Sequence, residues 1–180
     1  MNMFNKGNNI YNITNEALSK DKLMEKLEQS SVELNDYAYE LFQSDLYKPS
    51  TITYTATVVE LTLAEIGLTI GGNFGEIRSC IQSLGLLYCP LELASYIRLH
   101  KLHDKELSDR REKVLGKAPP GSITIFSEPL VNDDDFPKGF YIRTINGVPW
   151  LRGYRCSEDY VWDPGDRMIF TIEVNVTITL

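Results

Sequence analysis

The sequence predicts an α+β fold in which N-terminal helices pack on a mainly antiparallel C-terminal sheet. Apolar residues recur at helical spacing in much of the first half of the chain, and at every second position in the second half. Helices and strands are therefore largely segregated along the chain, which is typical of α+β proteins with the helices on one face of the sheet. A doubly wound nucleotide-binding fold would alternate strands with helices instead.

The composition is that of an ordinary globular protein. The chain has 180 residues, of which 43% are hydrophobic and 24% are charged. Residues 1–13 are rich in asparagine and carry few apolar side chains, so we expect a loose N-terminal arm there. We expect residues 14–180 to form a single α+β domain, with a helical part over about 19–102 and a β part over about 121–180.

Charge and cysteine content narrow the class of protein. The net charge is −7, which makes nucleic acid an unlikely partner because a generic nucleic-acid binder needs a positive field. We see neither a secretory signal nor an apolar run of membrane-spanning length. The three cysteines are odd in number and none has CxxC spacing, which favours reduced thiols over disulfides or a zinc ribbon. We therefore expect a soluble cytoplasmic protein without a cofactor or a metal.

The first predicted element is a long helix. Ser19 or Asp21 can cap its start, and it should end before Pro49, because a residue that precedes proline is disfavoured in the α region. Such an apolar stripe packs on the core of its own domain or, alternatively, forms a homodimer interface. The residues on the stripe are Leu23, Leu27, Leu34, Ala38 and Leu41.

A strand and a short helical turn are expected next. Residues 51–62, "TITYTATVVELT", are rich in threonine and β-branched side chains, which favour strands. Thr62 and Glu65 have the spacing of a capping box, and Gly67 stands where a helical turn would stop.

Two further helices and a loop complete the helical part. A helix is expected over about 74–84, with Gly85 as its C-terminal glycine. Pro90 favours the start of a third helix, because proline is tolerated at the first helical position. Residues 104–121 are charged and end in "KAPPGS", which predicts a loop or a poorly packed helix leading into one.

The last segment, 168–180, gives the strongest strand prediction. Its residues alternate between apolar and polar without interruption, which predicts one apolar face. At roughly 3.3 Å per residue such a strand would reach about 40 Å, so it should bend or pair with different partners at its two ends. The apolar face holds Met168, Phe170, Ile172, Val174, Val176, Ile178 and Leu180.

The Asn146-Gly147 pair predicts a hairpin within residues 139–155. In a two-residue type I′ turn, Arg143 lies opposite Trp150 and Tyr141 lies opposite Arg152. Pro149 then falls in a non-hydrogen-bonded pair, so the second strand should be a sheet edge at that point.

This register sorts the hairpin side chains into two faces. Phe140, Ile142 and Leu151 share the face that we assign to the core. The other face brings arginines beside aromatic rings, an arrangement suited to cation–π stacking and to binding a protein partner or a small anionic ligand. Alternatively, the side chains of this face pair only with one another on the surface, or residues 103–121 cover the face. The candidate binding residues are Tyr141, Arg143, Trp150, Arg152 and Tyr154.

Two other clusters suggest chemistry less strongly. Asp133, Asp134 and Asp135 are adjacent rather than alternating, so they lack calcium-loop spacing and are better interpreted as a solvated turn. His100 and His103 could share a metal if both lay on one helix, but they are the only histidines in the chain. Two solvated histidines at the end of an element are the plainer interpretation.

No motif specifies a reaction, which favours binding over catalysis without excluding an enzyme. We expect a binding or regulatory module, and an intracellular inhibitor or immunity-type protein would fit the size and acidity. One alternative is a small, metal-assisted hydrolase that uses Asp133–Asp135 with His100 or His103. A further alternative is a structural homo-oligomer that pairs through the apolar face of residues 168–180.

Overall fold

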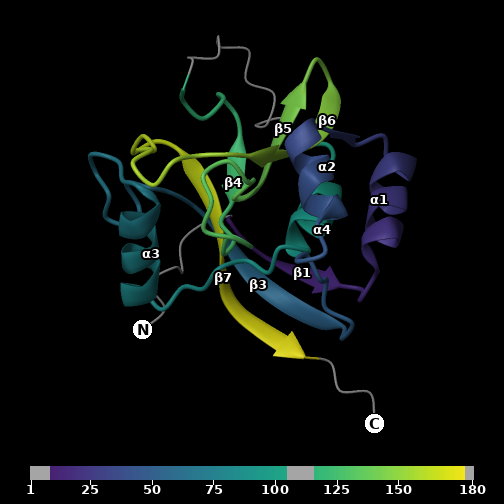
Figure 1. Ribbon diagram of the computed structural model, residues 1–180. Coiled ribbons are helices and arrows are strands. Elements are labelled where there is room, and N and C mark those ends of the chain that lie inside the picture. Colours follow the sequence, from purple (N-terminus) through teal and green to yellow (C-terminus); the bar gives the residue numbers. More distant parts are fainter. Residues whose placement is uncertain (1–8, 105–115, 177–180) are drawn as a thin grey trace.

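The computed structural model describes residues 9–104 and 116–176 and has an α+β fold (Figure 1). Within these ranges, no helix has the length and apolar character needed to cross a bilayer. The helices are α1 (Lys20–Gln29), α2 (Asp36–Gln43), α3 (Phe74–Ser83) and α4 (Leu93–His100). The strands are β1 (Ile10–Asn15), β2 (Glu33–Leu34), β3 (Tyr54–Thr62), β4 (Ile123–Ile125), β5 (Gly139–Ile145), β6 (Val148–Tyr154) and β7 (Arg167–Val176).

The strands form one mixed sheet in the order β1-β3-β7-β4-β5-β6-β2. β7 pairs with β3 antiparallel and with β4 parallel, and β2 pairs with β6 parallel. The prediction of a mainly antiparallel C-terminal sheet is therefore wrong. β1 and β3 come from the N-terminal half and extend the sheet beyond β7, so the segregation of helices and strands along the chain is incomplete.

The predicted loose arm over 1–13 is wrong for its last residues. Ile10–Ile13 belong to β1, which pairs antiparallel with β3, and Asn9 accepts a backbone hydrogen bond of 2.9 Å from Glu60. Ile13 is buried in the core. Backbone pairing with β3 holds this segment in the sheet, although its weak apolar pattern does not predict a strand. Residues 1–8 lie outside the described chain.

The predicted long helix is two helices, α1 and α2, separated by β2. Ser31 has φ of 55°, which takes the chain out of the helix, and Asn35 caps α2 by accepting a 3.0 Å bond from the Ala38 amide. The helical spacing continues across this break because both helices pack on the same core. Leu23, Leu27, Ala38 and Leu41 are all buried. α2 ends at Gln43, before Pro49 as predicted.

The short turn follows its predicted signals, and α3 ends at Ser83, shortly before the predicted Gly85, which has φ of 71°. The Thr62 hydroxyl accepts from the Glu65 amide at 3.3 Å, the Glu65 carboxylate accepts from the Thr62 amide at 2.7 Å, and Gly67 has φ of 102°. A second capping box, between Asn73 and Glu76, starts α3.

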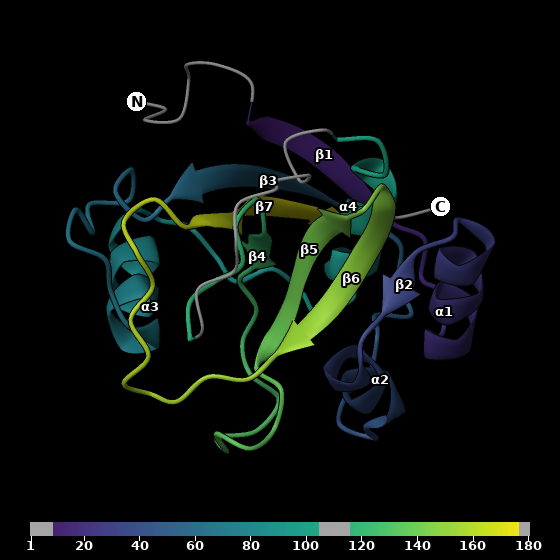
Figure 2. The same cartoon turned by 90° about the horizontal axis from the view of Figure 1, so that it is seen from above.

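Helices cover both faces of the sheet, so the prediction of helices on one face is wrong. α1, α2 and α4 contribute to one hydrophobic cluster, whereas Ile77 and Ile81 of α3 belong to a second. In β7, Ile169 packs in the first cluster and its neighbours Met168 and Phe170 pack in the second. Figure 2 shows α3 on one side of β7 and β4, and α1 and α2 on the other.

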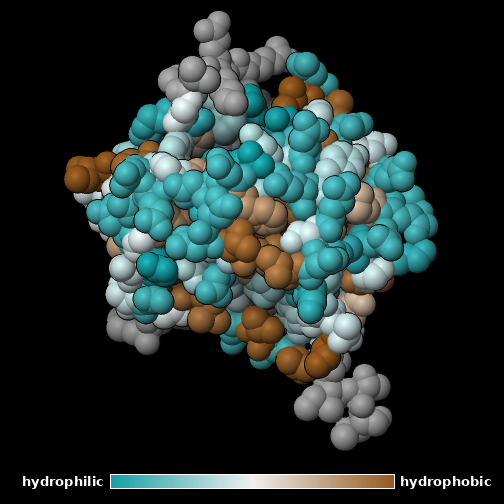
Figure 3. All heavy atoms as spheres, in the orientation of Figure 1, coloured by the Kyte–Doolittle hydropathy of each residue, from teal (hydrophilic) through white to brown (hydrophobic). Residues whose placement is uncertain are grey.

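A β-bulge divides the apolar face predicted for residues 168–180. Thr57 pairs with Glu173 and Val58 pairs with Thr171, so Ile172 is an extra residue in β7. The side chains beyond it change faces relative to Met168 and Phe170. Val174 and Val176 are 39% and 57% exposed. Figure 3 shows apolar side chains at the lower end of the molecule, where β7 ends in Figure 1. Residues 177–180 lie outside the described chain.

The hairpin matches its prediction. Asn146 and Gly147 have φ of 52° and 80°, as a type I′ turn requires. Arg143 pairs with Trp150, and Tyr141 pairs with Arg152. β2 pairs with only two residues of β6, so within the described chain Pro149 lies on an open edge of the sheet.

Burial of Cys89 gives the fold an alkaline limit. Burial raises the pKa of this thiol from 9.0 to about 12. Its contribution to stability is therefore fully present below pH 9 and is lost as the pH rises through about 12, because only the unfolded state releases the proton readily. We expect the urea midpoint to fall between pH 8 and pH 10, and to fall less in Cys89→Ala. An equal fall in both proteins would contradict this.

Candidate functional site

The predicted binding residues lie on the hairpin and are all half-buried. The Arg152 side chain donates from Nε to the Tyr141 hydroxyl at 2.8 Å, across the two strands. Its guanidinium carbon also lies 4.9 Å from the centre of the Trp150 ring. Arg152, two residues further along β6, thus lies over the Trp150 ring. The sequence suggested Arg143, on the facing strand, for this contact.

Arg143 and Tyr154 take different roles. The Arg143 carbonyl accepts a 3.3 Å bond from Arg98, and its own Nε is buried without a partner among the described residues. Tyr154 packs edge-on against Trp162 with ring centres 6.2 Å apart, and burial raises its pKa well above the usual range. The five predicted residues therefore do not form one flat surface.

Three of the five residues, Tyr141, Arg152 and Tyr154, line a cavity of about 320 Å³, which we call the hairpin cavity. Residues 116–119, in the loop before β4, form part of its wall. Sequence reasoning missed the other charged and aromatic lining residues, because they come from separate segments without a shared motif. These are Tyr37, Lys117, Arg155, Tyr160 and Trp162.

The side chain of Asn35 fixes one wall of the hairpin cavity. It donates to the Gly153 carbonyl at 3.0 Å and accepts from the Gly153 amide at 2.7 Å, so it continues the pairing of β2 with β6. The same oxygen caps α2 through Ala38. Tyr37, at the start of α2, is therefore held against β6, where the Arg155 guanidinium carbon lies 4.5 Å from its ring centre.

The hairpin cavity is basic although the protein is acidic. Arg152, Arg155 and Lys117 line it, and its described lining residues include no aspartate or glutamate. Lys117 pairs with Asp163 at 2.6 Å and Arg155 pairs with Glu40 at 2.8 Å. Both pairs are solvent-exposed and therefore weak.

Arg152 differs from the other two cations. Among the described residues it has no carboxylate partner, and Tyr141 occupies only its Nε. Within residues 9–104 and 116–176 no acceptor engages its two terminal nitrogens, which can form paired hydrogen bonds with a carboxylate or phosphate.

The Asp133–Asp135 segment forms a turn. The Asp133 carboxylate accepts from the Asp135 amide at 2.9 Å, and the Phe136 amide donates to the Asp133 carbonyl at 3.2 Å. Asp134 lies 3.2 Å from the Lys138 ammonium. The aspartates are thus engaged with their own backbone and with a nearby lysine.

The histidines lie at a different site. His100 is the last residue of α4 and stacks on Tyr11 with ring centres 5.0 Å apart. His100 and His103 line one cavity, and no residue of the Asp133–Asp135 turn lines it. Over the described ranges, no three histidine, cysteine, aspartate or glutamate side chains converge as metal ligands. The groups of the alternative hydrolase therefore do not share one cavity.

Comparison with known proteins does not identify a relative. No family model matches the chain, and no curated protein or solved structure is similar to it.

Proposed function

We propose that the protein is a binding module that holds a small planar anion in the hairpin cavity. The Arg152 guanidinium carries this proposal, because it is half-buried, is oriented by Tyr141 and Trp150, and has no carboxylate partner among the described residues. A guanidinium held in this way loses little side-chain entropy when it binds an anion.

The walls of the hairpin cavity favour a planar ligand. Tyr160 packs edge-on against Trp162 with ring centres 4.7 Å apart, and Tyr154 contacts the same indole. Aromatic walls with a few placed polar groups are typical of small-molecule sites. We therefore propose an aromatic carboxylate or a nucleotide phosphate as the ligand class.

A concave site favours a small ligand over a broad protein interface. An inhibitor or immunity-type role would use the same hairpin, with the partner inserting an acidic side chain beside Arg152. In either case the hairpin cavity acts by binding, and no catalytic group is assigned to it.

Calorimetric titration with benzoate and with adenosine monophosphate tests the proposal and separates the carboxylate class from the phosphate class. We expect one of the two to bind. Arg152→Gln should weaken its binding by about tenfold or more, because the variant loses the charge-assisted hydrogen bonds.

Two matched comparisons make the result specific. Benzamide keeps the ring without the charge and should bind at least about tenfold more weakly than benzoate if the carboxylate class is correct. Lys22→Gln removes an exposed charge on α1 and should leave affinity unchanged. If neither anion binds, or if Arg152→Gln binds as tightly as the wild type, the proposal is wrong.

A further inference from the structure

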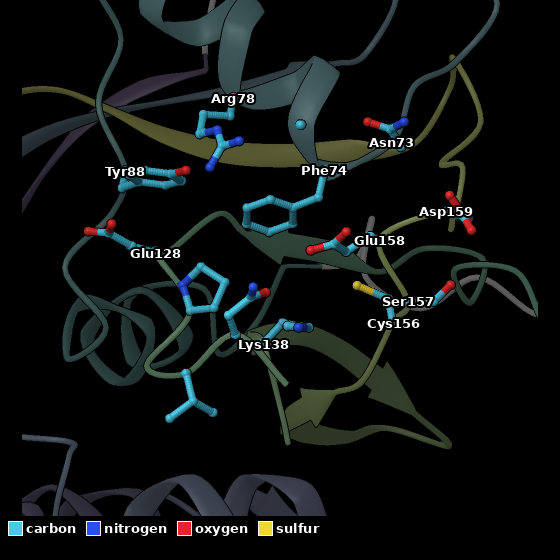
Figure 4. A pocket seen from close by; sticks show the side chains of 14 residues that line it. Asn73, Phe74, Arg78, Tyr88, Glu128, Lys138, Cys156, Ser157, Glu158 and Asp159 are labelled. Carbon is cyan, nitrogen blue, oxygen red and sulfur yellow. The ribbon is translucent and has the colours of Figure 1, made fainter. Parts of the chain in front are cut away.

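A second cavity, of about 520 Å³, lies between the start of α3 and the loops around residues 128–138 and 156–159 (Figure 4). We call it the α3 cavity. Among the described residues, Cys156 alone lines both this cavity and the hairpin cavity. The α3 cavity uses none of the five residues predicted for binding.

Lys138 places a positive charge in the α3 cavity. The residue is only 6% exposed, and its backbone amide donates to the Tyr154 carbonyl at 2.8 Å. Among the described residues, its ammonium has one carboxylate neighbour, Asp134, at 3.2 Å. The Asp134 side chain is 52% exposed, so water screens this pair. An ammonium has three donors, and a buried charge is stabilised by further acceptors, so Lys138 can accept an anion from the cavity.

Glu158 places a negative charge across the α3 cavity. Figure 4 shows its carboxylate directed into the cavity, near the Phe74 ring and Cys156. Glu158 is solvent-exposed, and no ion pair within residues 9–104 and 116–176 involves it. A carboxylate in this position can accept hydrogen bonds from a ligand ammonium group.

An aromatic surface lies above these two charges. The Phe74 ring centre is 4.6 Å from that of Phe126 and 6.5 Å from that of Tyr88, and the Phe74 and Tyr88 planes differ by 23°. Arg78 is directed towards Tyr88 at the far end of the α3 cavity (Figure 4). The part of the cavity beside Lys138 and Glu158 is thus polar on one side and apolar on the other.

From this arrangement we infer that the α3 cavity binds an apolar α-amino acid in its zwitterionic form. The ligand carboxylate pairs with Lys138, its ammonium pairs with Glu158, and its side chain packs on Phe74. Both ligand charges are needed, because an amine without a carboxylate adds no charge pair to Lys138, and an acid without an ammonium is repelled by Glu158. This site is independent of the anion proposed for the hairpin cavity.

Calorimetric titration with L-phenylalanine tests the inference against two derivatives. L-phenylalaninamide lacks the carboxylate, and N-acetyl-L-phenylalanine lacks the ammonium. We expect L-phenylalanine to bind at least about tenfold more tightly than either derivative. If phenylalanine does not bind, or binds no better than both derivatives, the inference is overturned.

Two variants assign the ligand charges to residues. Glu158→Gln should weaken phenylalanine binding by about tenfold or more without weakening the binding of N-acetyl-L-phenylalanine. Lys138→Met keeps the aliphatic stem and should weaken phenylalanine binding while leaving phenylalaninamide unaffected; a thermal melt of each variant confirms that it is folded. Equal affinity for phenylalanine in wild type and Glu158→Gln would overturn the assignment.

Two controls distinguish this site from other surfaces. Asp45→Asn removes an exposed carboxylate elsewhere and should leave phenylalanine affinity unchanged. Arg152→Gln should also leave it unchanged, because Arg152 lines the hairpin cavity and does not line the α3 cavity. Loss of phenylalanine binding in Arg152→Gln would indicate that the amino acid binds in the hairpin cavity, and would overturn the inference. If Arg152→Gln still binds phenylalanine and the wild type binds neither benzoate nor adenosine monophosphate, the amino-acid site is supported and the proposal for the hairpin cavity is wrong.

Discussion

Gly153→Ala is expected to lower the free energy of unfolding by about 3 kcal/mol or more, among the largest effects of any single methyl group in this chain. A Cβ atom at this position would lie 2.5 Å from the Tyr37 carbonyl carbon and 2.7 Å from the Ala38 amide nitrogen. Both are backbone atoms, so no side-chain rotation relieves the overlap. Urea denaturation followed by circular dichroism measures the change.

Gly165→Ala is the matched control for this substitution. A Cβ atom there has no neighbour within 4 Å and the backbone does not require glycine, so the urea midpoint should hardly move. Asn35→Ala should destabilise in the same direction as Gly153→Ala, because it removes the side chain that bonds Gly153 and caps α2. Similar midpoints for Gly153→Ala and Gly165→Ala would contradict the close packing of α2 on β6.

Arg98→Ala is expected to destabilise the protein by about 3 kcal/mol or more, and Arg98→Met by about 2 kcal/mol. Arg98 is fully buried in α4, and its guanidinium donates to the carbonyls of Arg143 and Lys101. The methionine variant retains much of the packing and loses only these bonds. The alanine variant loses the bonds and leaves a cavity as well.

Burial lowers the pKa of the Arg98 guanidinium to about 10, so it remains charged at neutral pH. Its desolvation therefore opposes folding and offsets part of what the two hydrogen bonds contribute. Chemical denaturation of both variants at pH 7 separates the packing contribution from the polar one. If Arg98→Met were as unstable as Arg98→Ala, the hydrogen bonds of the guanidinium would contribute more to the free energy of unfolding than the packing of the side-chain stem. An alanine variant with wild-type stability would contradict the burial of Arg98.

Local features of the fold could be predicted from local sequence. The Asn146-Gly147 turn gave the hairpin register because two residues with positive φ leave one way to pair the flanking strands. The capping box of Thr62 and Glu65 likewise involves only residues three apart.

The errors arose where distant segments decide the structure. An uninterrupted alternation in β7 predicted one apolar face, but the pairing with β3 places a bulge at Ile172, which a single strand's pattern does not reveal. Helical spacing across residues 23–41 concealed a break, because β2 pairs with a strand more than a hundred residues away.

The candidate site was predicted only in part for the same reason. Tyr141 and Arg152 could be brought together by one turn, and their hydrogen bond confirms that they meet. Lys117 and Trp162 reach the hairpin cavity from other parts of the chain, and no spacing rule connects them to the hairpin.

The position of β7 has a consequence for the protein during its synthesis. β7 separates β1 and β3 from β4, β5, β6 and β2 in the sheet, yet it follows all of them in the chain. Until it emerges from the ribosome, β3 and β4 each present an unpaired edge that can pair with another chain. We therefore expect the nascent chain to be most prone to aggregation just before residues 167–176 become available, and to benefit from a chaperone at that stage.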